Sequence, residues 1–302
     1  MISVLHLRVI DYGTALLLQQ SLVDLRKHRG IPDVLLLLEH PPVITFGRNS
    51  SRANLLASDD MLRKKSVELF ESDRGGDITF HGPGQLVGYP IFDLRGFSPR
   101  IGAVEFVRHI EEALIRTCGD LGIPAERICG LTGVWTQGAA QAVDCDGVPK
   151  PSQLKAAAPE SSTHKKIAAI GVHISRGITS HGFALNVTTD LDYFKLIVPC
   201  GISDRPVTSI AQELTGKRAI PSMEQVANAI SLNFGRVFAR QMLWVESLEA
   251  LLPAQERAIT SENADQKNDG TNPVGVPLIV PEDIRGVRRE QRPSTEDEVF
   301  LA

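Results

Sequence analysis

The segment DVLLLLEHPPVITFGR, residues 33–48, constrains the fold more than any other part of the chain. Four consecutive leucines are too few for a buried helix, and Pro41-Pro42 would interrupt the hydrogen bonds of a strand ladder. The segment therefore predicts two short, well buried strands. A strand that is apolar on both faces needs cover on both sides, so we expect helices to pack against its sheet.

Three segments have the apolar periodicity of covering helices. Residues 13–30 end in a Lys/Arg cluster, and residues 221–242 begin with Ser222 followed by Gln225, which is a capping-box pattern. Residues 101–122 form the clearest amphipathic pattern. Their apolar positions predict one buried face formed by Val104, Val107, Ile110, Leu114 and Cys118.

The remaining apolar segments predict further strands. Residues 66–94 are expected to form two strands joined by a glycine-rich loop, and residues 133–138 and 165–175 to form a hairpin. Residues 183–191 predict another strand, and no internal repeat is visible. The fold class expected from this order is α/β (α+β), with mixed sheets packed with helices.

Composition divides the chain near residue 245. The sequence has a net charge of −4, but twelve acidic and six basic side chains lie in residues 246–302, so residues 1–245 carry +2. The second region is rich in Pro, Asn, Asp, Glu and Gln, which predicts a disordered acidic tail. Residues 139–164, rich in Ala, Pro, Ser and Lys, are expected to be a flexible loop insert in the first region.

The sequence argues against several classes of protein. No apolar run approaches the roughly 18 residues that cross a bilayer, and the N-terminal segment lacks a signal-peptide pattern, so we expect a cytoplasmic protein without a membrane partner. A charge of +2 on residues 1–245 is too small to argue for nucleic-acid binding. The widely spaced cysteines argue against a zinc site or a disulfide framework; they are Cys118, Cys129, Cys145 and Cys200.

The first stretch suited to chemistry is RGGDITFHGPGQ, residues 74–85. Four glycines in a short loop leave room for a ligand to approach the backbone closely. The stretch matches neither the dinucleotide-binding nor the P-loop pattern, so a phosphate-binding role is unsupported. The alternative is a tight connection between strands, with a solvated Arg74 and a hydrogen-bonded His81.

The second stretch, residues 165–187, contains Lys166 at the mouth of the apolar segment IAAIGV. A lysine there could act in catalysis, or it could protect a strand edge against aggregation. His181-Gly182 before FALNV repeats the layout of His81-Gly82, so two such elements could form the walls of one pocket. A single histidine at a strand start could equally be structural.

The third stretch is IVPCGIS, residues 197–203. Free cysteine is often a buried, inert residue. In this stretch, however, Pro199 ends a strand and Gly201 relieves crowding, which would place Cys200 at an element terminus beside backbone N–H groups. Such surroundings stabilise a thiolate and can receive an oxyanion.

Taken together, these stretches resemble the octanoyltransferases of lipoic-acid biosynthesis. The resemblance is carried by RGGDITFHGPGQLVGYPIFDL, by GVW with KIAAIGVHISRGITSHGFALNV, and by VPCGI, and it spans about residues 5–245. It implies a fold similar to the catalytic domains of biotin and lipoate protein ligases. It also implies transfer of an octanoyl group from octanoyl-acyl carrier protein to a lysine of lipoyl domains, those of 2-oxoacid dehydrogenases and the glycine cleavage H protein, without a cofactor or metal.

The resemblance also implies roles for individual residues. The acyl-thioester nucleophile falls on Cys200, and the lysine that lowers its pKa falls on Lys166. The family's substrate-binding segments fall on Arg74, Gly75, Gly76, Asp77, Ile78, Thr79, Phe80, His81, Ala169, Ile170, Gly171, Gly182, Phe183 and Ala184.

These roles imply a two-step transfer. A cysteine thiol has a pKa of about 8.5, which an ammonium within about 4 to 6 Å lowers by roughly 1 to 3. Cys200 would then attack the donor thioester, and Lys166 would accept a proton from the incoming amine. His81 and His181 are further candidates for positioning the substrate. The apolar slot for the acyl chain is expected near Phe80, Phe183 and Ile170.

Three other functions fit part of the pattern. An ATP-dependent lipoate or biotin ligase would share the fold but would not need Cys200. A non-catalytic module that binds a carrier protein would keep the pocket without turnover. A cysteine hydrolase could pair Cys200 with His181, and it would release free octanoate when no acceptor is present.

Overall fold

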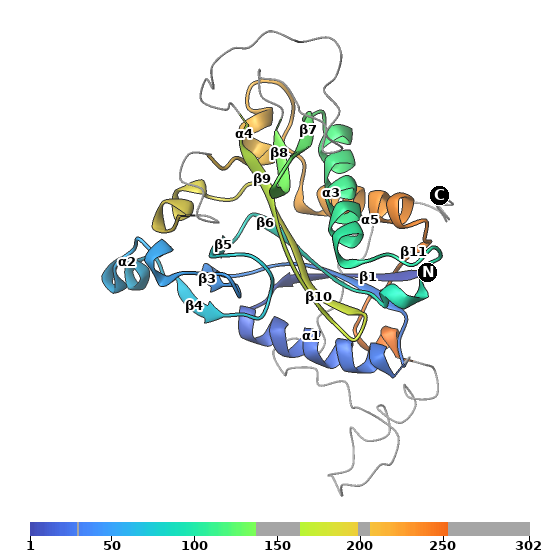
Figure 1. The fold of residues 1–302 in the computed structure, drawn as a ribbon. Helices are drawn as coiled ribbons and strands as arrows, with labels where there is room; N and C mark the ends of the chain where they lie inside the picture. The colour runs from blue at the N-terminus through green and yellow to red at the C-terminus, as the bar shows by residue number, and fades with distance from the viewer. Residues whose placement is uncertain (29, 137–163, 199–205, 253–302) are drawn as a thin grey trace, which may run out of the picture.

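The computed structural model describes residues 1–28, 30–136, 164–198 and 206–252. Within these ranges the chain forms one eight-stranded and one three-stranded sheet (Figure 1). The larger sheet contains, in spatial order, β11 (Met242–Trp244), β1 (Ile2–Val9), β2 (Asp33–Glu39), β6 (Gln85–Ile91), β10 (Ile178–Asn186), β9 (Lys166–Ser175), β8 (Leu131–Thr136) and β7 (Ala125–Ile128). The smaller contains β4 (Glu68–Glu71), β3 (Val43–Phe46) and β5 (Thr79–His81).

The larger sheet is mixed. Its β11-β1-β2 end is parallel, and every later neighbouring pair, from β2-β6 to β8-β7, is antiparallel. In the smaller sheet, β3 pairs in parallel with β4 and antiparallel with β5. The α-helices are α1 (Tyr12–Lys27), α2 (Asp59–Lys64), α3 (Ala103–Asp120), α4 (Ile210–Leu214) and α5 (Met223–Phe238). Shorter helical turns are η1 (Arg52–Asn54), η2 (Leu94–Gly96), η3 (Leu191–Leu196) and η5 (Glu249–Leu251).

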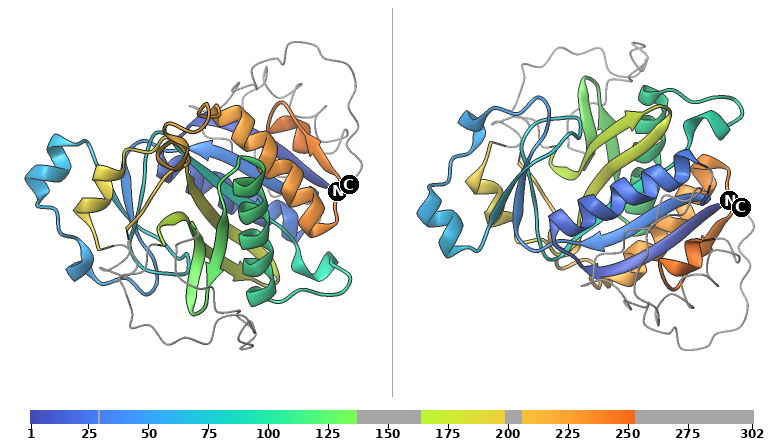
Figure 2. Two further views of the ribbon diagram at one scale, coloured as in Figure 1. Left: turned by 90° about the horizontal axis from the view of Figure 1, so that it is seen from above. Right: turned by 90° about the horizontal axis from the view of Figure 1, so that it is seen from below.

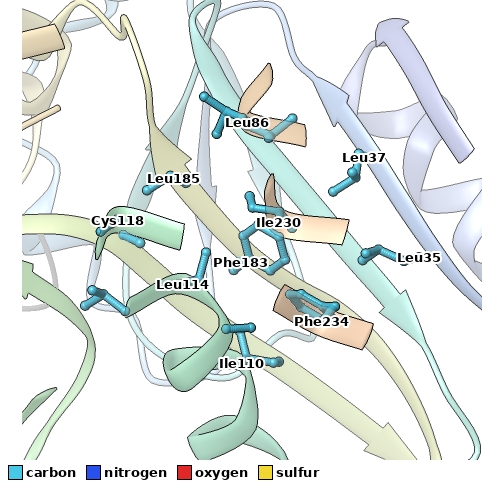
Figure 3. Close-up of a cluster of buried hydrophobic side chains, with 14 of the residues drawn as sticks. Leu35, Leu37, Leu86, Ile110, Leu114, Cys118, Phe183, Leu185, Ile230 and Phe234 are labelled. Atoms are coloured by element: carbon cyan, nitrogen blue, oxygen red, sulfur yellow. The ribbon is translucent and has the colours of Figure 1, made fainter. Parts of the chain in front are cut away.

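Helices cover both faces of the larger sheet. Figure 2 shows α3 and α5 side by side on one face and α1 on the other. The core beneath α3 and α5 joins side chains from both helices to the central strands (Figure 3). Its members include Leu35, Leu86, Phe183, Ile110 and Phe234. The described helices include none that is both long and apolar enough to span a membrane.

The second core lies under α1 and extends past the composition boundary at residue 245. Leu18 and Leu22 of α1 pack here against Leu36 of β2. The same cluster contains Leu248 and Leu252, so the chain continues to bury apolar side chains up to residue 252. The remainder of the predicted acidic tail lies outside the described residues, as does nearly all of the predicted insert.

The predicted mixed architecture is confirmed, including the two strands on either side of Pro41-Pro42. These two strands belong to different sheets. The predicted hairpin is also present, because β8 pairs antiparallel with β9. The strand expected at 183–191 instead spans Ile178–Asn186, so His181 lies inside β10 rather than before it. The proposed likeness to His81, which ends β5, is therefore wrong in this respect.

Two details of the predicted helices are also wrong. Val104 was placed on the buried face of residues 101–122, but its side chain is 76% exposed. It lies in the first turn of α3, and Phe106 takes the buried position instead. The helix that begins with the Ser222–Gln225 capping box ends at Phe238, because Ala239 adopts a left-handed conformation before β11. Cys118 is fully buried as predicted, and burial raises the pKa of its thiol to about 12.

Candidate active site

A pocket of about 390 Å³ lies between the glycine-rich loop and the β9–β10 hairpin. This volume is within the usual range for small-molecule sites. Twelve of the residues proposed from sequence line it: Arg74, Gly76, Asp77, Thr79, His81, Lys166, Ala169, Ile170, Gly171, Gly182, Phe183 and Ala184. The structure therefore brings together segments that are about 100 residues apart in the sequence.

Arg74 organises the glycine-rich loop from within. Its side chain is buried, and its guanidinium donates to the Thr45 carbonyl oxygen at 2.8 Å, to Thr45 Oγ1 and to the Gly75 carbonyl oxygen. The alternative of a solvated Arg74 is therefore wrong. Because Thr45 belongs to β3, the smaller sheet fixes this loop against the pocket.

Glycine is required where the loop meets the hairpin. The Gly75 N–H donates to the Val172 carbonyl oxygen at 3.0 Å, which joins the loop to β9. A Cβ added at Gly171 would lie 2.6 Å from the Gly75 carbonyl oxygen, closer than side-chain carbons approach. The two backbones can approach this closely only because position 171 has no side chain.

Lys166 is the first residue of β9, and it enters the pocket wall beside β8. Its side chain is largely buried, and Nζ lies 5.3 Å from the centroid of the Trp135 ring, a cation–π arrangement. Gly133 provides space for it, because a Cβ at that position would lie 2.8 Å from Lys166 Cε. The Gly133 N–H donates to Glu111 Oε1 at 3.1 Å, so a fully buried carboxylate of α3 supports this wall.

Two buried imidazoles are fixed beside the pocket. His40 Nδ1–H donates to the Ile10 carbonyl oxygen at 2.6 Å, and the Tyr89 hydroxyl donates to His40 Nε2 at 2.7 Å. His81 lies 5.9 Å from His40 between ring centroids and donates from Nδ1 to Gln85. Burial lowers the pKa of His40 to about 4 and that of His81 to about 3. Both rings are therefore neutral near pH 7.

His181 is held by a carboxylate. Its Nε2–H donates to Asp73 Oδ1 at 2.7 Å, and Asp73 also lies 2.9 Å from His173 Nδ1. Burial lowers the pKa of His181, although the hydrogen bond to Asp73 opposes the shift. Its backbone has φ 55°, and its N–H donates to Gln19 Oε1, so α1 stabilises this unusual conformation.

Cys200 lies outside the described residues, but both flanking segments are anchored near the site. The Val198 N–H donates to the Asn54 carbonyl oxygen at 2.8 Å. On the other side, the Lys166 N–H donates to the Pro206 carbonyl oxygen at 2.9 Å, and Val207 pairs with Lys166 as an isolated parallel bridge.

Three residues proposed from sequence are not among those that line the pocket. Gly75 makes the backbone contact with β9 described above, whereas Ile78 and Phe80 belong to a core cluster under the smaller sheet. Conversely, the sequence analysis missed Tyr12 and Tyr89, which line the pocket. Tyr12 stacks on His81 with ring centroids 6.2 Å apart. Tyr12 precedes the helix predicted at residues 13–30, and no pattern in the sequence indicated this contact.

The fold is that of the lipoate-protein ligases. A lipoate-protein ligase A bound with ATP matches the structure with a TM-score of 0.57 at 18% identity, over 88% of this chain and 96% of that chain. A bipartite lipoate-protein ligase from Thermoplasma acidophilum matches with a TM-score of 0.57 at 17% identity, over 96% of this chain and 98% of that chain. At these identities the likeness concerns the fold alone.

Sequence comparison identifies the family. Residues 11–235 match the model of the lipoyl protein ligase A/B catalytic domain. An octanoyltransferase of Koribacter versatilis is 60% identical over 85% of this chain and 92% of its own length. One of Acidobacterium capsulatum is 54% identical over 83% of this chain and 96% of its own length. The chain belongs to the lipoyl protein ligase A/B catalytic-domain family, and these relatives are acyltransferases.

Proposed function

We propose that this chain is an octanoyltransferase of lipoate biosynthesis that works through a thioester on Cys200, with Lys166 as its acid–base partner. The donor is octanoyl-acyl carrier protein, and the acceptors are lysines of lipoyl domains, including those of 2-oxoacid dehydrogenases and the glycine cleavage H protein. The family and the high identity to octanoyltransferases support the overall reaction. The position of Lys166 in the wall of the pocket is the observation that carries the mechanism.

The chemistry of the pocket suits an acyl thioester. Apolar side chains from three strands, Val87, Ile170 and Phe183, can contact a hydrocarbon chain. Arg74 and the neutral imidazole of His81 add polar groups to the same wall. An acyl chain can thus lie on apolar surface while its carbonyl carbon stays near Lys166.

Connectivity of the chain supports the pairing of Cys200 with Lys166. Pro206 follows Cys200 by six residues, and its carbonyl oxygen accepts a hydrogen bond from the Lys166 backbone. A chain of six residues spans at most about 20 Å when fully extended. This short connection to the strand that carries the lysine supports the proposed pairing.

The reaction then has two halves. In the first, the Cys200 thiolate attacks the donor carbonyl, the donor carbon–sulfur bond breaks, and the carrier thiol leaves with a proton from the Lys166 ammonium. In the second, the acceptor amine attacks the Cys200 thioester and Lys166, now neutral, takes a proton from it. Both thioesters have similar leaving groups, so the first transfer is nearly isoenergetic.

Intact-protein mass spectrometry tests this proposal. We expect octanoyl-acyl carrier protein to add one octanoyl group to the wild type at Cys200, without ATP, and a lipoyl domain to remove it. Cys200→Ala should gain no adduct. Cys118→Ala is the matched control, because that thiol is fully buried outside the pocket, and it should be acylated like the wild type. An adduct on any residue other than Cys200, or a requirement for ATP, would contradict the proposal.

A further inference from the structure

Gln85 sets the tautomer of His81. The Gln85 side-chain nitrogen donates to the Phe80 carbonyl oxygen at 3.2 Å and to Asn186 Oδ1 at 2.9 Å. A carbonyl oxygen can only accept, so the amide nitrogen points towards Phe80 and Gln85 Oε1 faces His81. His81 Nδ1, 2.7 Å from this oxygen, therefore carries the ring proton.

The other ring nitrogen of His81 is consequently an acceptor. Burial lowers the pKa of His81 to about 3, and Arg74, His40 and His181 oppose a second proton electrostatically. Tyr12 completes the titratable surroundings by stacking on the ring. Within the described part of the chain Nε2 makes no hydrogen bond, and His81 lines the pocket. The pocket wall thus presents a lone pair that does not titrate near neutral pH.

Further hydrogen bonds continue from Gln85 through Asn186 and connect His81 to Lys166. Asn186 Nδ2 donates to the Thr208 carbonyl oxygen at 2.9 Å, and the Thr208 N–H donates to the Lys166 carbonyl oxygen at 2.9 Å. Gln85, Asn186 and Lys166 also line one small cavity of about 20 Å³. Buried amides therefore fix His81 relative to the lysine of the proposed reaction.

We propose that Gln85 is a positioning residue for the second half-reaction: it holds His81 so that Nε2 accepts a hydrogen bond from the incoming lysine amine. This bond points the nitrogen lone pair at the Cys200 thioester. The inference deepens the proposed function and rests on it. The first half-reaction involves no acceptor lysine, so it does not need this hydrogen bond.

The protons of this step balance without a change at His81. The acceptor lysine begins as an ammonium with three protons. One is lost to solvent before the attack, one passes to neutral Lys166, and one remains on the amide, so Cys200 leaves as the thiolate and Lys166 is again an ammonium. The carbon–nitrogen bond forms as the carbon–sulfur bond breaks. His81 supplies only an acceptor, in keeping with a ring that is too weak a base to take the proton.

Gln85→Glu tests the inference, because a carboxylate beside His81 raises its pKa and turns the acceptor into a donor. Loading from octanoyl-acyl carrier protein should stay within about twofold of wild type, whereas release to a lipoyl domain should slow by about three- to tenfold near pH 5, because the carboxylate raises the His81 pKa from about 3 by roughly 1 to 3 and the protonated ring no longer accepts the hydrogen bond. The ratio of the release rates, variant to wild type, should rise with pH as the imidazolium loses its proton. Both rates can be followed by intact-protein mass spectrometry.

Substitution of His81 itself separates an acceptor from a base. His81→Gln keeps an acceptor that cannot take up a proton, and it should retain release within about fivefold, while His81→Leu should lose about tenfold or more. Asn233→Asp is the matched control for a buried amide-to-acid change, since Asn233 is fully buried and does not line the pocket. It should lower stability and leave both half-reactions unchanged.

The outcomes distinguish this inference from the function on which it rests. If the wild type gains no adduct at Cys200, the proposed function fails. If the wild type loads normally but Gln85→Glu releases at the wild-type rate near pH 5, or loads as slowly as it releases, the positioning role is overturned while the function stands. Selective loss of release in Gln85→Glu, with rescue in His81→Gln, supports it.

Discussion

Two buried clusters beside the pocket stabilise their titratable side chains in opposite ways. In the imidazole cluster, His40 and His81 hydrogen-bond to neutral groups, and burial lowers both of their pKa values. In the glutamate cluster, the fully buried carboxylate of Glu111 lies 2.7 Å from Arg108 Nη1 and 3.1 Å from Arg127 Nε. Burial thus neutralises the groups that lack an opposite charge, whereas the carboxylate is compensated by two guanidinium groups.

The difference suits the two places that the clusters occupy. In the imidazole cluster, His81 lines the pocket and His40 lies 5.9 Å from it between ring centroids, so a neutral ring of fixed tautomer offers a hydrogen bond there without attracting counter-ions. Glu111 is not among the residues that line the pocket; it is joined to β8 by the Gly133 N–H, which donates to its carboxylate. One cluster therefore supplies chemistry, and the other holds the strand against which Lys166 packs.

The largest expected effect is on the glutamate cluster. Glu111→Ala should lower the free energy of unfolding by about 3 kcal/mol, the low end for breaking a buried ion pair, because Arg108 and Arg127 remain partly exposed to water. Urea unfolding measures the change. Glu112→Ala is the matched control, since Glu112 is more exposed and also pairs with arginines, and it should cost less than about 1 kcal/mol. Equal losses in the two variants would show that burial adds nothing.

The burial of Glu111 is a feature that could not be predicted from the sequence. The helix at 101–122 and its central apolar face could be predicted from periodicity, because both are local properties. That a glutamate of this helix is fully buried depends on Arg127 of β7 and Gly133 of β8, which no spacing within the helix reveals. The error at Val104 has the same origin, because its exposure depends on how far the sheet extends under the first turn.

The candidate site shows the same limit. The glycine-rich loop and Lys166 could be predicted because their stretches are recognisable in the sequence itself. The solvated Arg74 could not be excluded, because its partner Thr45 lies on a strand 29 residues away. Tyr12 was missed for a similar reason, since its contact with His81 exists only after α1 and β5 are brought together.

The next effect tests whether Gly133, which joins Glu111 to β8, provides the space that Lys166 occupies. Gly133→Ala should cost about 2 kcal/mol, because φ is +126° and the added Cβ would lie 2.7 Å from the Ala168 carbonyl oxygen. Transfer activity should fall by about tenfold or more, since the same Cβ displaces Lys166. Thermal unfolding and the octanoyl transfer rate measure the two effects. Gly130→Ala has φ +79° with no heavy atom within 4 Å, so it should cost only about 1 kcal/mol from backbone strain. An alanine at 133 that is no more costly than one at 130 would remove the role assigned to Gly133.

The smallest effect tests the neutrality of the imidazole cluster. His40 and His81 have folded-state pKa values of about 4 and 3, below the value of about 6.5 in the unfolded chain. As pH falls below about 6.5 the unfolded chain binds protons that the folded protein does not, so stability decreases, and each histidine contributes a loss of about 1.5 kcal/mol between roughly pH 6.5 and pH 5. Above about pH 6.5 both states are neutral and the contribution is constant. His81→Gln should therefore flatten the fall in unfolding free energy over this interval by about 1.5 kcal/mol relative to wild type, as measured by urea titrations at the two pH values. A variant with the same pH dependence as the wild type would mean that His81 is protonated in the folded protein, and the contrast between the two clusters would fail.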